Sequence, residues 1–164
     1  MTRKAPRNSW RSSGRFAKKA LGLSRFDELH NAGSVDTDVV SFLFKAHSLA
    51  PTYQAILAGR SLAVSLITLA EIEYGMEAKN WGANRRDLMR RFLARFTPLL
   101  PDTETARAWV RIRCACEKKG KPISFADAWI AAAAVQLNIP LVTHNASDYA
   151  AVESLVLLTA ATNP

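Results

Sequence analysis

The sequence contains little cysteine, which limits the chemistry available to the chain. Only Cys114 and Cys116 are present among 164 residues. They lie two positions apart in a helical pattern, so their side chains point roughly 200° apart around the helix axis. We therefore expect neither a disulfide between them nor one metal ion held by both. Two free thiols are typical of a protein in a reducing cytoplasm.

Long apolar runs are missing as well. The longest, AWIAAAAVQL at residues 128–137, is shorter than the about 18 residues that a membrane-spanning helix needs. The N-terminal residues include no apolar segment with a small-residue cleavage site, which a secretory signal peptide has. We predict a cytoplasmic protein without membrane contact.

Acidic residues are scarce near the N-terminus, so most of the net charge of +8 lies in that part of the chain. Residues 1–33 carry eight Lys and Arg against two acids, whereas residues 34–164 carry 14 Lys and Arg against 12 acids. We expect residues 1–33 to form a basic, partly disordered arm and residues 34–164 to form one domain. The arm is either a solvated tail or a non-specific contact for polyphosphate.

The apolar pattern from residue 34 onward alternates between strand-like and helix-like segments. Strands separated by helices favour a parallel sheet with helices on both faces, so we predict an α/β fold. The predicted strands are 34–37, 62–68, 98–100, 139–145 and 154–159. The predicted helices are 38–47, 51–59, 69–79, 85–96, 104–120 and 124–138.

Acidic and amide side chains follow several of the predicted strands. Ligands of open parallel sheets bind beyond the carboxyl ends of the strands. Asp127 instead lies in the first turn of an apolar helix. The side chains that follow the strands are those of Asp36, Asp38, Glu71, Asn145 and Asp148.

Each of these acids also has a purely structural explanation. The segments TLAE, ending at Glu71, and SFAD, ending at Asp127, have the spacing of a helix capping box. Asp38 could cap a helix that opens at Val39. Several carboxylates at one sheet edge would nevertheless repel one another unless a cation compensates. Oxygen ligands without a Cys or His cluster favour Mg²⁺, or Mn²⁺, over Zn²⁺.

Four segments, VDTDVVSFL, VSLITLAEIEYGM, ISFADAWIAAAA and LVTHNASDY, resemble in order and spacing those of PIN-domain ribonucleases. The resemblance is strongest to VapC-like toxins of type II toxin–antitoxin pairs, and it covers residues 34–158. It implies a three-layer α/β/α sandwich with a central, mainly parallel sheet. It also implies a Mg²⁺-dependent endoribonuclease that hydrolyses RNA phosphodiester bonds, a cognate antitoxin protein and a homodimer. Relatives usually begin at the first strand, whereas here about 33 residues precede it.

The resemblance also assigns residue roles by position. Asp148 is favoured over Asn145 as a fourth ligand because of its charge. Three acids match the metal-binding and catalytic set: Asp36, Glu71 and Asp127. Three further residues match supporting or substrate-positioning groups: Asp38, Thr143 and Asn145.

Two surface features suggest partner contacts. The basic helix at 85–96 either contacts RNA or is simply a solvated face, and the segment AEIEYGMEAKNW could contribute apolar contacts through Tyr74, Met76 and Trp81. The four candidate RNA contacts are Arg86, Arg90, Arg91 and Arg95.

Two other functions are compatible with parts of the sequence. DTDVV also resembles the opening motif of haloacid-dehalogenase-type phosphatases, in which Asp36 would be the nucleophile. Alternatively, the chain is a catalytically silent PIN-like domain that binds RNA or protein. The phosphatase is disfavoured because its later paired acids and a lysine after a suitable strand are missing, and the complete set of PIN-type acids argues against the silent domain.

Overall fold

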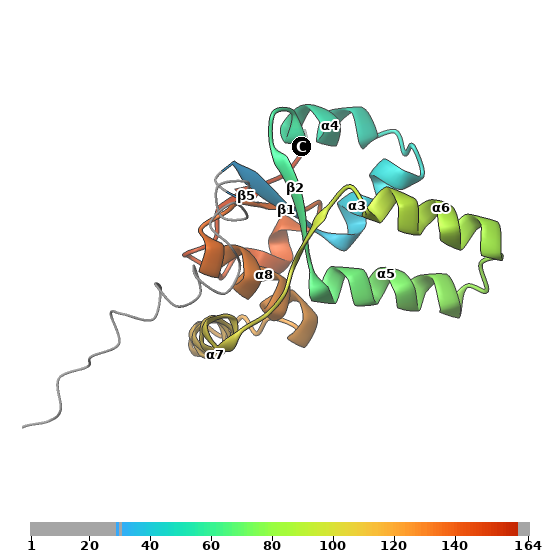
Figure 1. Ribbon diagram of the computed structural model, residues 1–164. Helices are drawn as coiled ribbons and strands as arrows, with labels where there is room; N and C mark the ends of the chain where they lie inside the picture. The colour runs from blue at the N-terminus through green and yellow to red at the C-terminus, as the bar shows by residue number, and fades with distance from the viewer. Residues whose placement is uncertain (1–28, 30, 161–164) are drawn as a thin grey trace, which may run out of the picture. The chain divides into compact units, whose positions relative to one another are not determined.

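Five short strands form one parallel sheet in the order β3–β2–β1–β4–β5 among the residues described by a computed structural model, 29 and 31–160 (Figure 1). The expected disorder of the basic arm concerns residues that lie outside this description, apart from its last few positions. All four strand pairings are parallel. The strands are β1 (Ala32–Val35), β2 (Ser61–Ser65), β3 (Thr97–Leu99), β4 (Leu141–Val142) and β5 (Leu157–Leu158).

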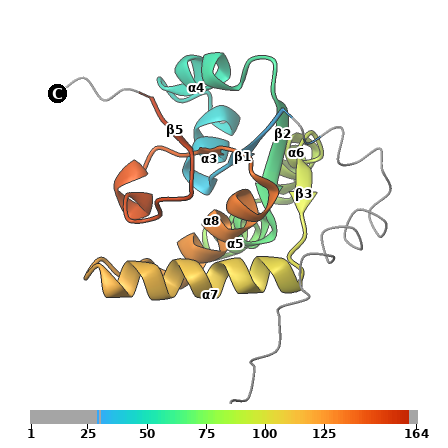
Figure 2. The ribbon, with the colours of Figure 1, turned by 90° about the vertical axis from the view of Figure 1, so that its left-hand side faces the viewer.

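Helices cover both faces of this sheet, which confirms the predicted three-layer α/β/α sandwich. Figure 2 shows α3 and α4 on one side of β1, with α7 and α8 on the other. The helices are α3 (Thr37–Phe44), α4 (Ala50–Leu57), α5 (Leu66–Ala78), α6 (Ala83–Leu93), α7 (Thr103–Lys118), α8 (Phe125–Leu137) and the short 3₁₀-helix η2 (Ala146–Tyr149). None of the described helices combines the length and the apolar composition required to cross a membrane.

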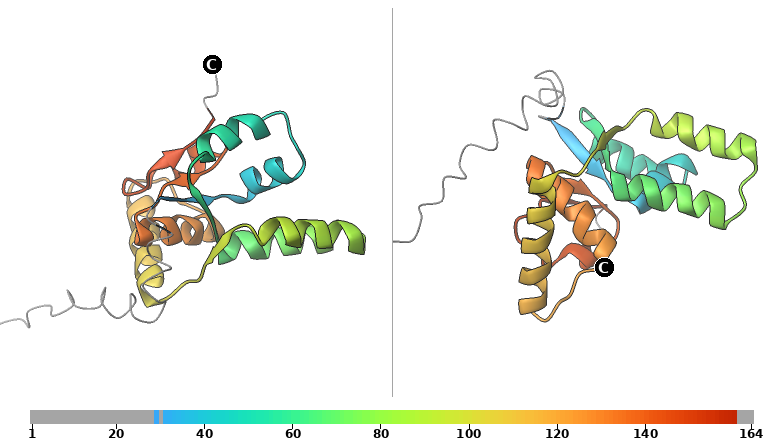
Figure 3. Two further views of the ribbon diagram at one scale, coloured as in Figure 1. Left: turned by 45° about the horizontal axis from the view of Figure 1, so that its top comes forward. Right: turned by 60° about the horizontal axis from the view of Figure 1, so that its bottom comes forward.

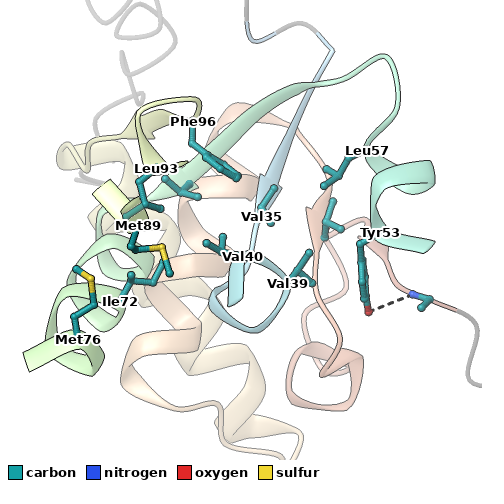
Figure 4. Packing of buried hydrophobic residues seen from close by; sticks show 13 residues of the cluster. Val35, Val39, Val40, Tyr53, Leu57, Ile72, Met76, Met89, Leu93 and Phe96 are labelled. Atoms are coloured by element: carbon teal, nitrogen blue, oxygen red, sulfur yellow. Dashed lines mark hydrogen bonds between the residues drawn. The ribbon is translucent and has the colours of Figure 1, made fainter. Parts of the chain in front are cut away.

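The main core lies between the sheet and α3, α4, α5 and α6 (Figure 4). Val35 of β1 and Val39 and Val40 of α3 are fully buried there. Tyr53 of α4 is also fully buried, and its hydroxyl accepts a hydrogen bond from the amide of Ala160 at 3.4 Å. This packing fixes the start of α3, and therefore the residues that directly follow β1.

The opposite face is covered by α8, whose buried positions are mostly alanines. Small side chains let a helix approach a sheet closely, and α7 packs along the outer side of α8. Cys116 of α7 is buried in this packing whereas Cys114 is exposed, and both are free thiols.

Helices α5 and α6 run side by side and extend away from the sheet (Figure 3). Two ion pairs link them, between Arg86 and Glu77 and between Arg90 and Glu73. Because both pairs are exposed, each contributes at most about 1 kcal/mol.

The structure shifts several predicted boundaries. β1 begins at Ala32, which pairs with Ser61, so the domain starts before residue 34. Residues 66–68 belong to α5 and not to a strand, because the Ser65 hydroxyl accepts a hydrogen bond from the amide of Thr68 and starts the helix there. The last two strands contain two residues each, fewer than predicted.

Candidate active site

Three acids reach the carboxyl edge of the sheet from three separate elements. Asp36 directly follows β1 and caps α3. Glu71 lies in the second turn of α5, which follows β2, and Asp127 lies in the first turn of α8. β1 is the central strand, with β2 on one side and β4 on the other. The segments that follow these three strands therefore meet at the carboxyl edge of the sheet, where open parallel sheets bind their ligands.

Asp36 is the most enclosed of the three acids, with 7% of its surface exposed. Its Oδ1 accepts a hydrogen bond from the amide of Thr37 at 2.8 Å, which caps the helix. Its Oδ2 accepts one from the Thr143 hydroxyl at 2.9 Å, just after β4. Protein donors therefore fix both oxygens of this carboxylate.

Tyr149 at the end of η2 connects Asp36 to Asp127. Its buried hydroxyl lies 2.9 Å from Asp36 Oδ2 and 3.3 Å from Asp127 Oδ1, and it donates to these carboxylates. One hydroxyl thus lies between two acids that are 91 residues apart in the chain. A donor in that place offsets part of their repulsion.

Glu71 is held by a second hydroxyl. Thr37 Oγ1 donates to Glu71 Oε2 at 2.5 Å. The capping box expected for TLAE is wrong, because Ser65 and not Thr68 caps α5. Glu71 is therefore not needed to start its helix, and its carboxylate is available to the site.

Only half of the capping box expected for SFAD is present among the described contacts: Ser124 caps α8, but the Asp127 carboxylate accepts from the Ser124 hydroxyl and not from its backbone amide. The Ser124 hydroxyl accepts from the amide of Asp127 at 3.0 Å and caps α8. The same hydroxyl donates to Asp127 Oδ2 at 2.5 Å. Ser124 can therefore cap α8 and orient the Asp127 carboxylate at the same time. Among the described contacts, Asp127 Oδ1 accepts a hydrogen bond only from the Tyr149 hydroxyl.

Asp38 connects the first helix to the loop after β4. Its Oδ1 accepts from the amide of Val39 at 2.5 Å and its Oδ2 from the amide of His144 at 3.0 Å. The imidazole of His144 lies 3.0 Å from the Tyr53 hydroxyl. Asp38 therefore positions the segment that carries Thr143, which in turn donates to Asp36.

Burial and mutual repulsion perturb this group of acids. Burial raises the pKa of Asp36, and the charge of Asp127 raises it further. Burial also raises the pKa of Glu71, with added repulsion from Asp36 and Asp127. The pKa of Asp38 is raised by burial and by the charge of Asp36. Holding these groups ionised therefore costs free energy that a bound cation would recover.

The fourth predicted ligand is separate from these three. Asp148 is exposed on η2, and its amide donates to the carbonyl of Asn145 at 3.0 Å. Asn145 is also exposed, and its amide donates to Thr143 Oγ1 at 3.1 Å. Among the described contacts, neither side chain reaches the three acids, so the choice between the two remains a prediction.

Two of the four predicted RNA contacts, Arg86 and Arg90, form ion pairs with acids of α5. Arg86 pairs with Glu77 and also donates to the carbonyl of Trp81. Arg90 makes two hydrogen bonds to Glu73, at 3.0 and 2.8 Å. Arg91 and Arg95 are exposed, and the Arg95 guanidinium lies over the Phe92 ring.

The expected apolar surface on α5 is only partly present. Tyr74 is 75% exposed, whereas Met76 is buried in the core. Trp81 is half-buried and stacks on Phe44. Tyr74 alone of the three remains a candidate for partner contact.

The donor set suits a hard divalent cation, although no direct ligand cage is preformed. Within the described part of the chain, no three or more His, Cys, Asp or Glu side chains form a group that could hold a metal ion. Mg²⁺ usually takes one or two carboxylates directly and keeps several waters, so it does not require three direct protein ligands. Carboxylates that repel one another and carry raised pKa values fit such a partly hydrated ion.

The hydroxyl donors are what sequence reasoning missed. Thr37 donates to Glu71, Ser124 to Asp127, and Tyr149 to both Asp36 and Asp127. Only Thr143, which donates to Asp36, was expected to contribute. A Tyr following Asp148 gave no periodic or spacing signal of its own. Its role depends on the turn of η2, which directs residue 149 into the core.

The chain is similar to known proteins along most of its length. The family model described as PIN domain matches residues 34–154. Ribonuclease VapC5 of Mycobacterium tuberculosis is 30% identical over 128 residues, covering 74% of this chain and 88% of that protein. Ribonuclease VapC1 of Haemophilus influenzae is 27% identical over 124 residues, covering 74% and 92%.

Solved structures show the same fold. VapBC2 from Rickettsia felis, bound to a DNA fragment from its promoter, aligns with a TM-score of 0.71 at 23% identity over 79% of this chain and 99% of that chain. VapBC-1 from nontypeable Haemophilus influenzae aligns with a TM-score of 0.64 at 26% identity over 78% and 97%.

Proposed function

Because the chain belongs to the PIN domain family, we propose that it is a Mg²⁺-dependent endoribonuclease of the VapC type, with Mn²⁺ as an alternative ion. The observation that carries the proposal is the meeting of Asp36, Glu71 and Asp127 at one sheet edge, where burial and repulsion raise the pKa values of the first two. Relatives named ribonuclease support the choice of reaction.

The reaction is hydrolysis of an RNA phosphodiester, leaving a 5′-phosphate and a 3′-hydroxyl. Asp36, Glu71 and Asp127 would hold the divalent ion, which would lower the pKa of the attacking water and neutralise charge on the leaving oxygen. The task of the chain is to hold ionised carboxylates in fixed orientations. Thr143 and Tyr149 orient Asp36, Thr37 orients Glu71, and Ser124 orients Asp127. Supporting contacts of this kind commonly change metal affinity by about 10–100-fold when removed.

A protein partner forms the second part of the proposal. Several of the similar solved structures are VapBC or toxin–antitoxin structures. We propose that this chain is the toxin of such a pair and acts in the cytoplasm, where its two free thiols remain reduced. The test is co-purification with the product of a neighbouring gene and loss of RNA cleavage in that complex.

We also propose a homodimer that uses an aromatic surface of α7 and α8. Trp109 stacks on Trp129 with ring centroids 5.6 Å apart, and Phe125 contacts Trp109 at 5.4 Å while 61% exposed. Aromatic side chains are enriched at protein interfaces. Light scattering should show a dimer that Phe125→Ser dissociates and that Val156→Ser, at another exposed apolar position, leaves intact.

The two alternative functions have less support. The donors to Asp36 among the described residues are one amide and two hydroxyls, an arrangement that orients a carboxylate as a ligand. A phosphatase would instead form an aspartyl-phosphate at Asp36, which trapping and mass spectrometry would detect. A silent domain would bind RNA and leave it intact.

One experiment tests the reaction directly. Purified protein is incubated with RNA and Mg²⁺ or with EDTA, and the ends of the products are sequenced. Cleavage that needs Mg²⁺ and is lost in Asp36→Asn and Asp127→Asn supports the proposal. Equal cleavage in EDTA, or full activity in both variants, contradicts it. Circular dichroism verifies that the variants are folded.

A further inference from the structure

We propose that the groove between α3 and α5 binds the phosphate backbone of the RNA through Lys45 and Lys79, an inference that rests on the proposed ribonuclease function. This groove has a volume of about 140 Å³ and is lined by residues of both helices. Thr37 and Glu71 of the active site lie at one end of these lining segments. The two lysines lie at the other.

The two helices give the groove its direction. α3 begins after Asp36, and Lys45 is its C-cap residue; Lys79 is the C-cap residue of α5. Eight residues separate Thr37 from Lys45, and eight separate Glu71 from Lys79, which corresponds to about 12 Å of helix in each case. At about 3.4 Å per stacked nucleotide, a single strand that enters the active site would place a phosphate about three nucleotides away near both lysines.

The charges favour this groove as the RNA-binding site over the basic helix at 85–96, which the sequence also offers. Arg86 and Arg90 form ion pairs with acids of α5. Neither Lys45 nor Lys79 takes part in any ion pair seen among the described residues, and both are exposed. The Arg85 guanidinium lies 3.8 Å from the ring centroid of Trp81, a lining residue, and adds positive charge at this end.

A lysine at a helix C-terminus also interacts favourably with the helix dipole, so position alone does not identify a phosphate site. Gly75 provides an independent observation. It lies within α5 and lines the groove, yet a Cβ added there would meet no atom within 4 Å, and its φ is not positive. Glycine destabilises a helix interior relative to alanine. Neither the backbone nor the packing of this chain needs glycine at 75. A large side chain there would instead take up space that an RNA strand in the groove requires.

The binding test uses a fluorescent single-stranded RNA of mixed sequence in EDTA, with the full chain. Lys45→Gln and Lys79→Gln each remove one phosphate contact. The matched control is Arg60→Gln, a cation just before β2 and hence at the opposite edge of the sheet. For single strands the binding constant varies with salt to the power of about −0.7 per contact. Each lysine variant should therefore bind about fourfold more weakly at 0.15 M salt, and the double variant should reduce the log–log salt slope by about 1.4.

Blocking the groove gives a second test that leaves the charges intact. Gly75→Leu should weaken RNA binding, whereas Gly75→Ala should raise the melting temperature and affect binding less. If the double lysine variant binds RNA like the wild type with an unchanged salt slope, the proposal is overturned. The RNA-binding proposal is also overturned if the double lysine variant retains RNA binding but loses binding of an acidic peptide. The groove would then be a binding site for a protein partner.

Cleavage and binding assays together separate a wrong groove assignment from a wrong proposed function. If the wild type does not cleave RNA with Mg²⁺, the function itself is wrong. If it cleaves and the lysine variants show unchanged KM and unchanged binding, only the groove assignment fails. If the assignment holds, KM rises in both lysine variants while kcat changes little, because neither lysine lies among the acids.

Discussion

Replacing Tyr149 with phenylalanine tests how the acidic site is held together. The substitution removes one buried hydroxyl that donates to Asp36 Oδ2 at 2.9 Å and approaches Asp127 Oδ1 at 3.3 Å. A hydrogen bond to a charged group contributes about 1.5–3 kcal/mol. A domain of this size loses roughly 4 °C of melting temperature per kcal/mol. The metal-free Tyr149→Phe protein should therefore melt about 6–12 °C below the wild type.

The same substitution should weaken the binding of Mg²⁺ or Mn²⁺. Without the hydroxyl, Asp36 and Asp127 lose a shared donor that fixes their orientation, and such losses reduce metal affinity by about 10–100-fold. Isothermal titration with Mn²⁺ measures this affinity. The matched control is Tyr53→Phe, because the Tyr53 hydroxyl is also buried but contacts His144, the Thr143 carbonyl and the Ala160 amide.

The two variants separate a structural role from a positioning role. Tyr53→Phe should lower the melting temperature and leave the Mn²⁺ affinity within twofold of wild type. If Tyr149→Phe binds Mn²⁺ as tightly as the wild type, or more tightly, the hydroxyl does not orient the acids for an ion. The assignment of Tyr149 as a positioning residue would then be wrong.

Three further outcomes are expected. Ser124→Ala should lower the free energy of unfolding by about 1 kcal/mol through loss of the N-cap, which chemical denaturation measures. It should also weaken Mn²⁺ binding, measured by titration, because Asp127 Oδ2 loses its donor. Wild-type affinity for Mn²⁺ would contradict the role of Ser124 in orienting Asp127. Asp36 and Glu71 should contribute more to the stability of the metal-free protein as pH falls from 7 toward the usual pKa values of 3.8 for Asp and 4.5 for Glu, since their raised pKa values mean that the folded state binds more protons at these sites. The slope of the free energy of unfolding against pH should therefore be more positive in Asp36→Asn than in the wild type, and an unchanged slope would contradict the burial assigned to that acid. Deletion of residues 1–30 should preserve the melting temperature within a few degrees, whereas deletion of residues 1–33 should lower it, because Ala32 and Gly33 pair with β2; equal stability of the two truncations would contradict this boundary.

The sequence predicted the acids better than their surroundings. Asp36 and Glu71 could be placed at one edge because strand ends in a parallel sheet converge, whatever their exact lengths. Asp127 follows no strand, and only the family resemblance assigned it to the same site. The role of Glu71 was harder to predict, since TLAE has capping spacing and only the start of α5 at Leu66 shows that Ser65 is the cap. Local spacing alone cannot reveal which of two candidate caps begins a helix.

Contacts between distant segments were the least predictable. Tyr149 reaches Asp36 across 113 residues, and Thr37 reaches Glu71 across 34. Such contacts depend on packing in three dimensions and leave no periodic pattern. The RNA contacts of the basic helix stay a prediction. Two of its arginines, Arg86 and Arg90, pair with Glu77 and Glu73 of the neighbouring helix, and no local sequence pattern reveals such pairing between helices.

The central claim is that these carboxylates are crowded at the sheet edge in order to bind a divalent ion. Glu71→Gln tests it most directly, because the variant removes one repelling charge while its amide oxygen can still accept from Thr37. The melting temperature is measured in EDTA and in Mg²⁺ for both proteins. We predict that Glu71→Gln melts higher than the wild type in EDTA and gains much less from Mg²⁺. A variant that is less stable in EDTA and gains as much from Mg²⁺ as the wild type would contradict the account.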